Sequence, residues 1–367
     1  MNTNEMPSLL IVTDGPIENA PARLRAYQYS DSWRCAGFNV EILDCGPYTR
    51  VADSNVVSSR MQQADLVFIQ RNLDEDVHGA AKQFNKPVIF DYDDALFYVR
   101  SSQILASREQ ASIREVALRW YRRIFRGHPL YSGKRRQLNK AITSAAAVVT
   151  GNEYLASYTR KFNQNVFVVP TVVNVSGVPV KAHSDGAPVV IGWIGVAHNF
   201  IHLDYIGEAL SEIGRRFGDK VVLKVVSSQL YQSSQIAVTN KKWKLNEESS
   251  DVTSFDIGIM PLLDDSFAEG KCAFKAILCM SHGVPVVVSD VGMNRNAVRH
   301  GETGFLAKST QDWVAHLSVL VESASSRQRM GMAARRDMKQ RYSVEAVFPH
   351  LLSAANSVLP RAERVVR

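Results

Sequence analysis

Short apolar runs that alternate with helical stretches recur along this chain in two series, and they constrain its fold more than any other feature. Strands that are apolar throughout are typical of parallel sheets with helices on both faces. We expect strands at residues 8–13, 39–43, 66–70, 87–91, 147–150 and 166–169, and then at 189–193, 221–226, 257–260 and 284–289. The sequence therefore predicts two α/β halves.

A polar stretch with Gly and Pro at residues 174–188 separates the two series and is typical of a linker. At 367 residues the chain is also longer than one ordinary core requires. We expect an N-terminal domain over 1–178, a C-terminal domain over 179–342 and a last helical segment over 343–367. Two Rossmann-like α/β/α domains that face each other across a cleft are the predicted architecture.

The composition is that of a soluble globular protein, with 46% hydrophobic and 22% charged residues. The start of the sequence lacks a basic segment, and its apolar run at 9–12 is too short for a signal peptide, so we expect a cytoplasmic protein. The four cysteines form no Cys-x-x-Cys pair, which argues against a zinc site or a disulfide framework.

The formal net charge of +7 is concentrated in one segment. Residues 114–136 hold eight Lys and Arg residues against one acid, Glu115, with aromatic residues between them. This pattern is typical of a basic amphipathic element on an anionic membrane face, although a solvated helix and loop would look the same. The predicted membrane contacts are Arg119, Trp120, Arg122, Arg123, Phe125 and Arg126. No nucleic-acid recognition motif accompanies the charge.

Residues 254–307 carry the strongest sign of a binding site. Each of two predicted strands is followed by a turn that opens a helix, the first with Gly270 and Lys271 and the second with Gly292 and Asn294. Free backbone N–H groups at such helix starts bind phosphate. Lys271 and Lys275 are four residues apart and should share one helical stripe, either facing an anion or reaching solvent from a half-buried helix.

Residues 270–275 read Gly-Lys-Cys-Ala-Phe-Lys, and this run resembles the donor-site segment of glycosyltransferase family 4. These are retaining enzymes of the GT-B architecture, and one branch carries a Gly-Lys-Cys-x-Phe-Lys pattern. Further motifs extend the resemblance over nearly the whole chain: Gly15 with Arg23 and Arg25, NKPVIFDYDDALF at 85–97, TGNEYL at 150–155, PTVV at 170–173 and IGWIG at 191–195.

The resemblance implies a hexosyltransferase that moves a sugar from a nucleotide diphosphate sugar to a hydroxyl of a glycan or lipid-linked glycan, in cell-surface polysaccharide synthesis and without a metal or other cofactor. It also implies that the last helix packs back toward the N-terminal domain. The donor-binding residues would be Gly195, His198, Asn199, Gly270, Lys271, Lys275, Gly292, Met293 and Asn294. The acceptor-binding residues would be Gly15, Arg23, Arg25 and Asp91.

The chain departs from the family pattern at its paired glutamates. Those two positions, eight residues apart, are Gly270 and Leu278 here, and Asn296 replaces a further glutamate. Glu269, one residue early, is the candidate for contact with the donor sugar. A non-catalytic donor-binding or scaffold protein is therefore an alternative.

Asp91, Asp93 and Asp94 follow a predicted parallel strand and form the strongest acidic cluster. A carboxylate of Asp93 or Asp94 could orient or partly deprotonate an acceptor hydroxyl, which makes them catalytic candidates, and helix capping is the structural alternative. The same string also resembles the Asp-x-Asp opening of magnesium-dependent phosphatases, with Asp91 as nucleophile, but no convincing second metal motif follows it.

Overall fold

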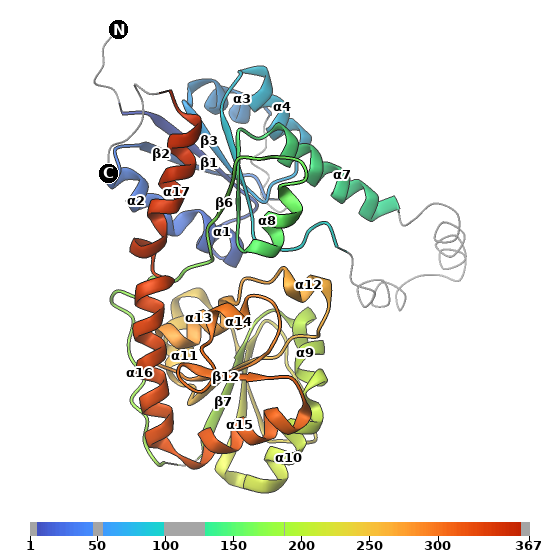
Figure 1. Ribbon diagram of the computed structural model, residues 1–367, viewed down its shortest axis with the longest axis vertical. Coiled ribbons are helices and arrows are strands. Elements are labelled where there is room, and N and C mark those ends of the chain that lie inside the picture. Colours follow the sequence, from blue (N-terminus) through green and yellow to red (C-terminus); the bar gives the residue numbers. More distant parts are fainter. Residues whose placement is uncertain (1–5, 47–53, 99–128, 187, 361–367) are drawn as a thin grey trace. The chain divides into compact units, whose positions relative to one another are not determined.

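The structure is a computed structural model that describes residues 6–46, 54–98, 129–186 and 188–360 (Figure 1). It divides into two compact units, the first made of Met1–Val169 with Phe348–Arg367 and the second of Pro170–Val347. The divisions fall at 169/170 and 347/348, where the sequence predicted 178/179 and 342/343. The six predicted membrane contacts between Arg119 and Arg126 lie outside the described residues.

The first unit holds a six-stranded parallel sheet in the order β2-β1-β3-β4-β5-β6. Its strands are β1 (Ser8–Thr13), β2 (Asn39–Asp44), β3 (Leu66–Gln70), β4 (Val88–Tyr92), β5 (Ala147–Thr150) and β6 (Val166–Val168). Its helices are α1 (Ala20–Arg25), α2 (Ser30–Cys35), α3 (Ser54–Gln63), α4 (Glu75–Gln83), α7 (Pro129–Ser144) and α8 (Glu153–Thr159), with a 3-10 turn at Tyr27–Tyr29. All six predicted strands are confirmed to within one residue.

Helix α17 (Val344–Val358) carries the chain back into the first unit. The ring of Phe348 packs edge-on against Trp33, with 4.9 Å between ring centres, and lies 6.2 Å from the ring of Tyr29. Both partners are almost fully buried, so aromatic packing anchors this helix to α2 and the turn before it.

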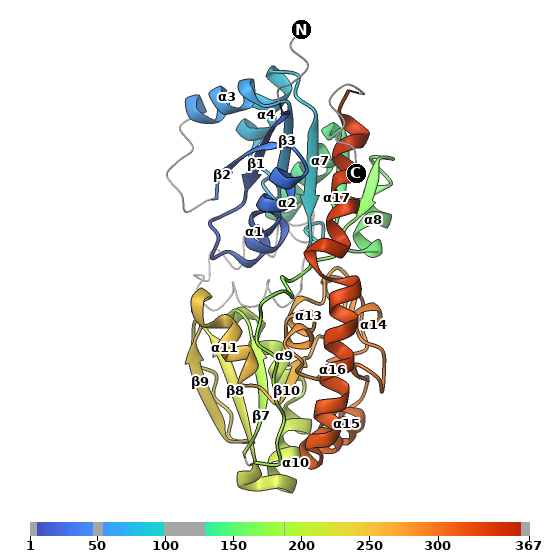
Figure 2. The same cartoon turned by 90° about the vertical axis from the view of Figure 1, so that its left-hand side faces the viewer.

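The second unit holds another six-stranded parallel sheet, in the order β12-β11-β10-β7-β8-β9 (Figure 2). Its strands are β7 (Val189–Ile194), β8 (Val221–Ser227), β9 (Val238–Lys242), β10 (Ile257–Met260), β11 (Val286–Ser289) and β12 (Gly304–Ala307). Its helices are α9 (Phe200–Tyr205), α10 (Gly207–Phe217), α11 (Glu248–Thr253), α12 (Ser266–Glu269), α13 (Phe274–Ser281), α14 (Asn294–Ala297), α15 (Thr310–Glu322) and α16 (Ala324–Arg341). Three 3-10 turns, at Ala197–Asn199, Gly218–Lys220 and Leu245–Glu247, complete it.

Helices cover the second sheet (Figure 1), and an apolar core lies between them and each of its faces. One core packs residues of α13, α14 and α16 against the strands, and the other packs residues of α9, α10 and α15 against the opposite face. This is the arrangement that the uniformly apolar strands predicted, and the fold class of two parallel α/β sheets is confirmed.

The predicted linker at 174–188 belongs to the second unit and is fixed to it by hydrogen bonds. The Arg335 guanidinium donates to the carbonyls of Val175 and Val178, and Arg327 donates to the carbonyl of Ser184. Lys181 N–H donates to the carbonyl of His282. Its polar composition reflects an extended segment that lies over the helices of this unit.

Candidate active site

The second sheet changes winding direction between β7 and β10. The connection from β7 to β8 runs through α9 and α10 on one face, whereas the connection from β10 to β11 runs through α13 on the other. Ligands of open parallel sheets bind at such a point, outside the carboxyl ends of the strands. The residues to consider are therefore those that directly follow β7, β10 and β11.

Lys275 lies over the end of β7. A Cβ atom on Gly195, the first residue after that strand, would be 2.7 Å from Lys275 Cε and 2.9 Å from the Trp193 ring. The lysine Nζ is 5.6 Å from the centre of that ring. Lys275 is also the second residue of α13, where a cation opposes the helix dipole unless an anion is bound nearby. The structure thus brings two predicted donor residues together in a place suited to an anion.

The predicted stripe of Lys271 and Lys275 on one helix is wrong. A separate short helix, α12, ends at Glu269, and Ala273 takes a left-handed φ of 55° before α13 begins at Phe274. Lys271 lies in the connection between the two helices, and its Nζ is 4.4 Å from the centre of the Phe267 ring. The cause is local: the Asp265 side chain accepts from Ala268 N–H and caps α12 as a helix of its own.

Glu269 and Gly292 meet at the ends of β10 and β11. A Cβ atom on Gly292, whose φ is +50°, would be 2.9 Å from Glu269 Cα and from the Ala268 carbonyl, so only glycine fits this approach. Arg295 pairs with Asp290 at 2.7 Å and lies 3.5 Å from the Glu269 carboxylate. The structure thus places the Glu269 carboxylate beside the turn that opens α14.

The side chain of Asn294 supports this turn from within. It is 1% exposed, its Nδ2 donates to the carbonyl of Ser289, and its Oδ1 has no hydrogen-bond partner among the described residues. Met293 is half-buried against the core. Any contribution of Met293 to an anion site would come from its backbone N–H, whereas the N–H of Asn294 donates to the carbonyl of Val291 at 3.1 Å.

The loop after β7 places His198 on the surface and Asn199 half-buried, before α9. Sequence reasoning missed the neighbouring His202, which is buried and whose Nδ1 accepts from Leu263 N–H at 3.1 Å. This bond joins α9, which follows β7, to the segment that follows β10. The two strands that flank the switch point therefore have their exits fixed to each other.

The positions that carry glutamates in the family pattern, Gly270 and Leu278, are both buried. The Leu278 carbonyl lies 2.8 Å from His282 Nδ1, and His282 Nε2 lies 2.8 Å from Ser249 Oγ. Burial lowers the pKa of His282, which favours the neutral ring. This end of α13 is a packed core element with no carboxylate to meet a ribose.

In the first unit, Arg71 joins three carboxylates at the carboxyl edge of the sheet. Its Nη1 lies 3.1 Å from Asp93 Oδ1 and 3.3 Å from Asp94 Oδ2, and its Nε lies 4.0 Å from Asp14 Oδ2. Asp14, Arg71 and Asp93 directly follow β1, β3 and β4, and Asp94 comes next after Asp93. Residues 95–98 form no helix, so among the described residues Asp93 and Asp94 cap none there.

Arg25 and Asp91 form an ion pair beneath this edge, and each side chain is 1% exposed. Arg25 Nε lies 3.2 Å from Asp91 Oδ2, its Nη2 donates to the other carboxylate oxygen, and its Nη1 donates to the carbonyl of Val169 at 2.5 Å. Burial raises the pKa of the Asp91 carboxyl, and the guanidinium opposes that rise. This closed pair fits a role in holding β4 and α1 together, and it argues against the phosphatase alternative, which needs an accessible Asp91.

The loop after β1 and the helix α1 that follows it hold the remaining predicted acceptor residues, Gly15 and Arg23. Gly15 is buried with a φ of 151°, and a Cβ atom there would be 2.6 Å from Asn19 Nδ2. Arg23 on α1 is half-buried. Their roles toward an acceptor stay predictions.

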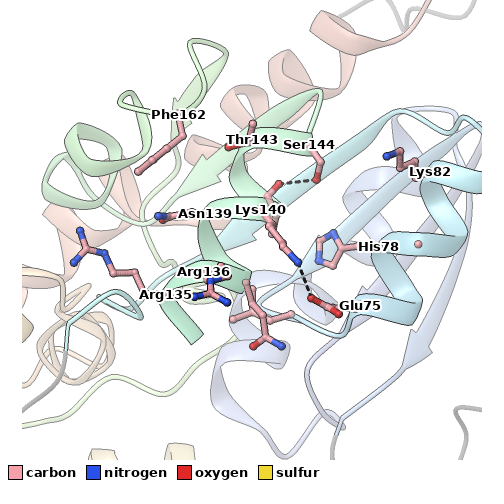
Figure 3. A pocket seen from close by; sticks show the side chains of 14 residues that line it. Glu75, His78, Lys82, Arg135, Arg136, Asn139, Lys140, Thr143, Ser144 and Phe162 are labelled. Atoms are coloured by element: carbon pink, nitrogen blue, oxygen red, sulfur yellow. Dashed lines mark hydrogen bonds and ion pairs between the residues drawn. The ribbon is translucent and has the colours of Figure 1, made fainter. Parts of the chain in front are cut away.

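A basic pocket of about 860 Å³ lies between α4 and α7 in the first unit (Figure 3). Lys82, Arg135, Arg136 and Lys140 line it, against one acid, Glu75, which pairs with Lys140 at 3.0 Å. Arg135 and Arg136 belong to the basic segment that the sequence predicts at 114–136. The described end of that segment therefore contributes cations to a concave surface.

The described part of the chain lacks two kinds of feature, metal-binding side-chain clusters and membrane-spanning helices. Across those residues, no group of three or more His, Cys, Asp or Glu side chains is arranged to hold a metal ion. Within the same ranges, none of the helices has both the length and the apolar character that crossing a bilayer requires.

Comparison with known proteins supports a glycosyltransferase. Residues 188–323, which span β7 to α15, match the family model described as Glycosyl transferases group 1. A comparison with curated protein sequences gave no match.

Several solved structures share the fold over almost the whole chain. Anabaena HepE in complex with UDP-glucose has a TM-score of 0.67 at 13% identity, covering 95% of this chain and 99% of HepE. Sucrose-phosphate synthase from Thermosynechococcus elongatus has a TM-score of 0.65 at 13% identity, covering 95% and 98%. A glycosyltransferase from Rickettsia africae has a TM-score of 0.62 at 12% identity, covering 97% and 99%. The fold is therefore that of GT-B glycosyltransferases.

Proposed function

We propose that this protein is a glycosyltransferase that transfers a sugar from a nucleotide diphosphate sugar to a hydroxyl group of an acceptor. The observation that carries the proposal is the position of Lys275, over Gly195 at the switch point of the second sheet. This point lies inside the segment that matches the glycosyltransferase family model. HepE, which shares the fold, binds UDP-glucose in its crystal structure, and this supports a nucleotide sugar as donor.

The chemical task in the second unit is to stabilise the negative charge that grows on the leaving diphosphate. Lys275 and Lys271 supply positive charge, and the N–H groups of Gly292 and Met293 supply hydrogen-bond donors, whereas Gly270 ends α12 and its N–H donates to the carbonyl of Phe267 at 3.2 Å. Preorganised donors of this kind are commonly the largest single contribution to catalysis. Glu269 would contact the sugar, since its carboxylate lies beside the turn formed by Gly292.

The acceptor task falls to the carboxylates at the edge of the first sheet. Asp93 or Asp94 would accept a hydrogen bond from the acceptor hydroxyl and draw off its proton as the new bond forms. The buried Arg25–Asp91 pair fixes the strand from which they emerge. Gly15, in the loop after β1, and Arg23, on α1, would contact the acceptor.

The finer features of the proposal follow the family resemblance. They are retention at the anomeric carbon, a hexose as the transferred sugar, no metal, and a glycan or lipid-linked glycan acceptor in cell-surface polysaccharide synthesis. The cations of 114–136 and of the basic pocket would hold the protein at an anionic inner membrane face, where a lipid-linked acceptor is present.

A thermal-shift panel of UDP, GDP, dTDP, ADP and CMP sugars tests donor binding. A ligand at about 100 times its dissociation constant adds roughly 2.7 kcal/mol of stability. The sugar that shifts the melting temperature would then be incubated with glycan acceptors, and NMR would give the anomeric configuration of the product. If no nucleotide sugar stabilises the protein, the proposal is wrong. Binding without turnover on any acceptor would instead favour the non-catalytic donor-binding alternative, which the absence of a carboxylate at Gly270 and Leu278 also suggests.

A further inference from the structure

We propose that Arg71 is a positioning residue for the transfer, because its guanidinium holds the carboxylates of Asp93 and Asp94 in place and supplies the positive charge that faces them. The inference rests on the proposed function, in which these carboxylates meet the acceptor hydroxyl. It assigns a role to a residue that no motif of the sequence singles out.

The first argument is the geometry of the ion pairs. One guanidinium nitrogen, Arg71 Nη1, is within 3.3 Å of both Asp93 Oδ1 and Asp94 Oδ2. The Arg71 side chain is 18% exposed, and those of Asp93 and Asp94 are 13% and 19% exposed. Charge interactions at such half-buried sites are stronger than at an open surface. Arg71 therefore fixes the distance between the two carboxylates.

The second argument is the backbone of Arg71. Its φ is +53°, a left-handed conformation that is unfavourable for a residue other than glycine. Its N–H donates to the carbonyl of Asp91 at 2.8 Å, so the turn is bound to β4. Strained residues of this kind concentrate at functional sites. The ion pairs of the Arg71 side chain offset the strain and account for an arginine at this position.

The third argument is the balance of charge. Three carboxylates, from Asp14, Asp93 and Asp94, surround one guanidinium. Asp44 and Lys134 also act on Asp14, and the Arg25–Asp91 pair below adds no net charge. Without Arg71, like-charge repulsion would favour protonation of one carboxylate. A protonated carboxyl cannot take the proton of the acceptor hydroxyl, so the charge of Arg71 is coupled to the reaction.

Two substitutions separate these effects. Arg71→Asn removes the charge, and Asn tolerates the left-handed backbone. Arg71→Lys keeps the charge but loses the planar guanidinium, which can donate to both carboxylates at once. For Arg71→Asn we expect the acid limb of the pH–rate profile to move up by about one pH unit, with up to roughly tenfold lower transfer at pH values below the wild-type limb and full recovery above the shifted limb. For Arg71→Lys we expect a lower rate across all pH values with the limb unmoved.

Two further measurements keep the test independent of folding and of the proposed function. Arg34→Asn, which breaks an exposed pair with Asp31 in the same unit, is the matched control and should change nothing. ¹³C NMR titration of labelled aspartates, in wild type and Arg71→Asn, reports carboxylate ionisation without any turnover. Higher titration points in the variant support the proposal. An unmoved acid limb and unmoved titration points in Arg71→Asn would overturn it. A wild-type protein that transfers no sugar would instead reject the proposed function.

Discussion

At the scale of single residues, Lys275 is the cation best placed to meet the leaving diphosphate. For Lys275→Ala we expect turnover to fall about 100-fold to 1000-fold, since that is the usual cost of losing one donor to a developing anion. The melting temperature should hold or rise slightly, because the variant removes a cation from the start of α13. Lys220→Ala, an exposed lysine that directly precedes β8 and so lies at the opposite edge of the sheet, is the control. Wild-type turnover in Lys275→Ala would place the donor elsewhere.

Gly195 tests the same contact from the opposite side. In Gly195→Ala the new Cβ would be 2.7 Å from Lys275 Cε and 2.9 Å from the Trp193 ring, so the end of the lysine and the ring must both move. We expect about tenfold weaker donor binding, close to 1.4 kcal/mol, in a calorimetric titration. Gly79→Ala on α4 is the matched control, because no other atom lies within 4 Å of its Cβ and alanine favours a helix. Equal donor affinity in both variants would contradict the assignment.

Sequence reasoning at this scale found residues that follow apolar strands but missed partners that only the fold brings near. Gly195, Lys275, Asp93 and Asp94 were predicted because motifs carry them. Arg71 was not, since it lies 22 residues from Asp93 in sequence and meets it only because β3 and β4 pair. The shared stripe of Lys271 and Lys275 failed because the cap at Asp265 and the left-handed Ala273 divide one expected helix into two.

At the scale of elements, Asp256 fixes the segment 174–188 to the second sheet, and this predicts that the stability of the fold depends on pH. Burial alone would raise the pKa of Asp256, but the His183 ring 3.8 Å away, the hydrogen bond from Val190 N–H and the Lys181 ammonium outweigh it and lower the pKa from 3.8 to about 2. The ionised form therefore stabilises the fold above pH 3.8, and this contribution is lost as the pH falls from about 4 to 2. We expect Asp256→Asn to lower the urea midpoint at pH 7 and to match wild type near pH 2.

The control for this prediction is Asp219→Asn, an exposed aspartate in the turn before β8. It should leave the urea midpoint unchanged at every pH. A constant difference between Asp256→Asn and wild type from pH 7 to pH 2 would show that shape, not charge, is what Asp256 contributes.

Element prediction succeeded for all central strands and failed at the two edge strands of the second sheet. Eight of the ten predicted strands are central, and β2 and β6 are the edge strands of the first sheet. The polar β9 has no fully buried residue and β12 has only four residues, two of them half-buried, so neither shows the continuous apolar pattern of a buried parallel strand. The segment 174–188 looked like a linker because hydrogen bonds from arginine side chains, rather than apolar burial, hold it.

At the scale of the whole molecule, the proposed mechanism needs no metal, because lysines and backbone N–H groups meet the leaving diphosphate. We expect the transfer rate in excess EDTA to stay within about twofold of the rate without it. Magnesium added back after dialysis should not increase it. A rate that falls at least tenfold in EDTA and returns with magnesium would contradict this mechanism, and it would mean that a divalent cation carries part of the phosphate charge.

The uneven distribution of charge predicts where the molecule meets its surroundings. The net charge is +7, and residues 114–136 alone hold eight cations and one acid. Each Lys or Arg near an anionic bilayer contributes about 1 kcal/mol, and this attraction decays over roughly 8 Å at physiological salt. We therefore expect the protein to sediment with vesicles that contain phosphatidylserine or phosphatidylglycerol, and to do so less as salt is raised.

The position of the charge, rather than its total, is what this prediction tests. Changing Arg119, Arg122, Arg123 and Arg126 to Ser should abolish most vesicle binding. A control that changes Arg215, Arg329, Arg336 and Lys339 to Ser removes the same charge from exposed positions of the second unit and should leave binding intact. An equal loss of vesicle binding in both variants would show that net charge alone accounts for the binding. Equal sedimentation of wild type with neutral and anionic vesicles, or no sedimentation with either, would favour a soluble acceptor. The reason is that an enzyme acting on a lipid-linked glycan has to reach the membrane face that presents this acceptor.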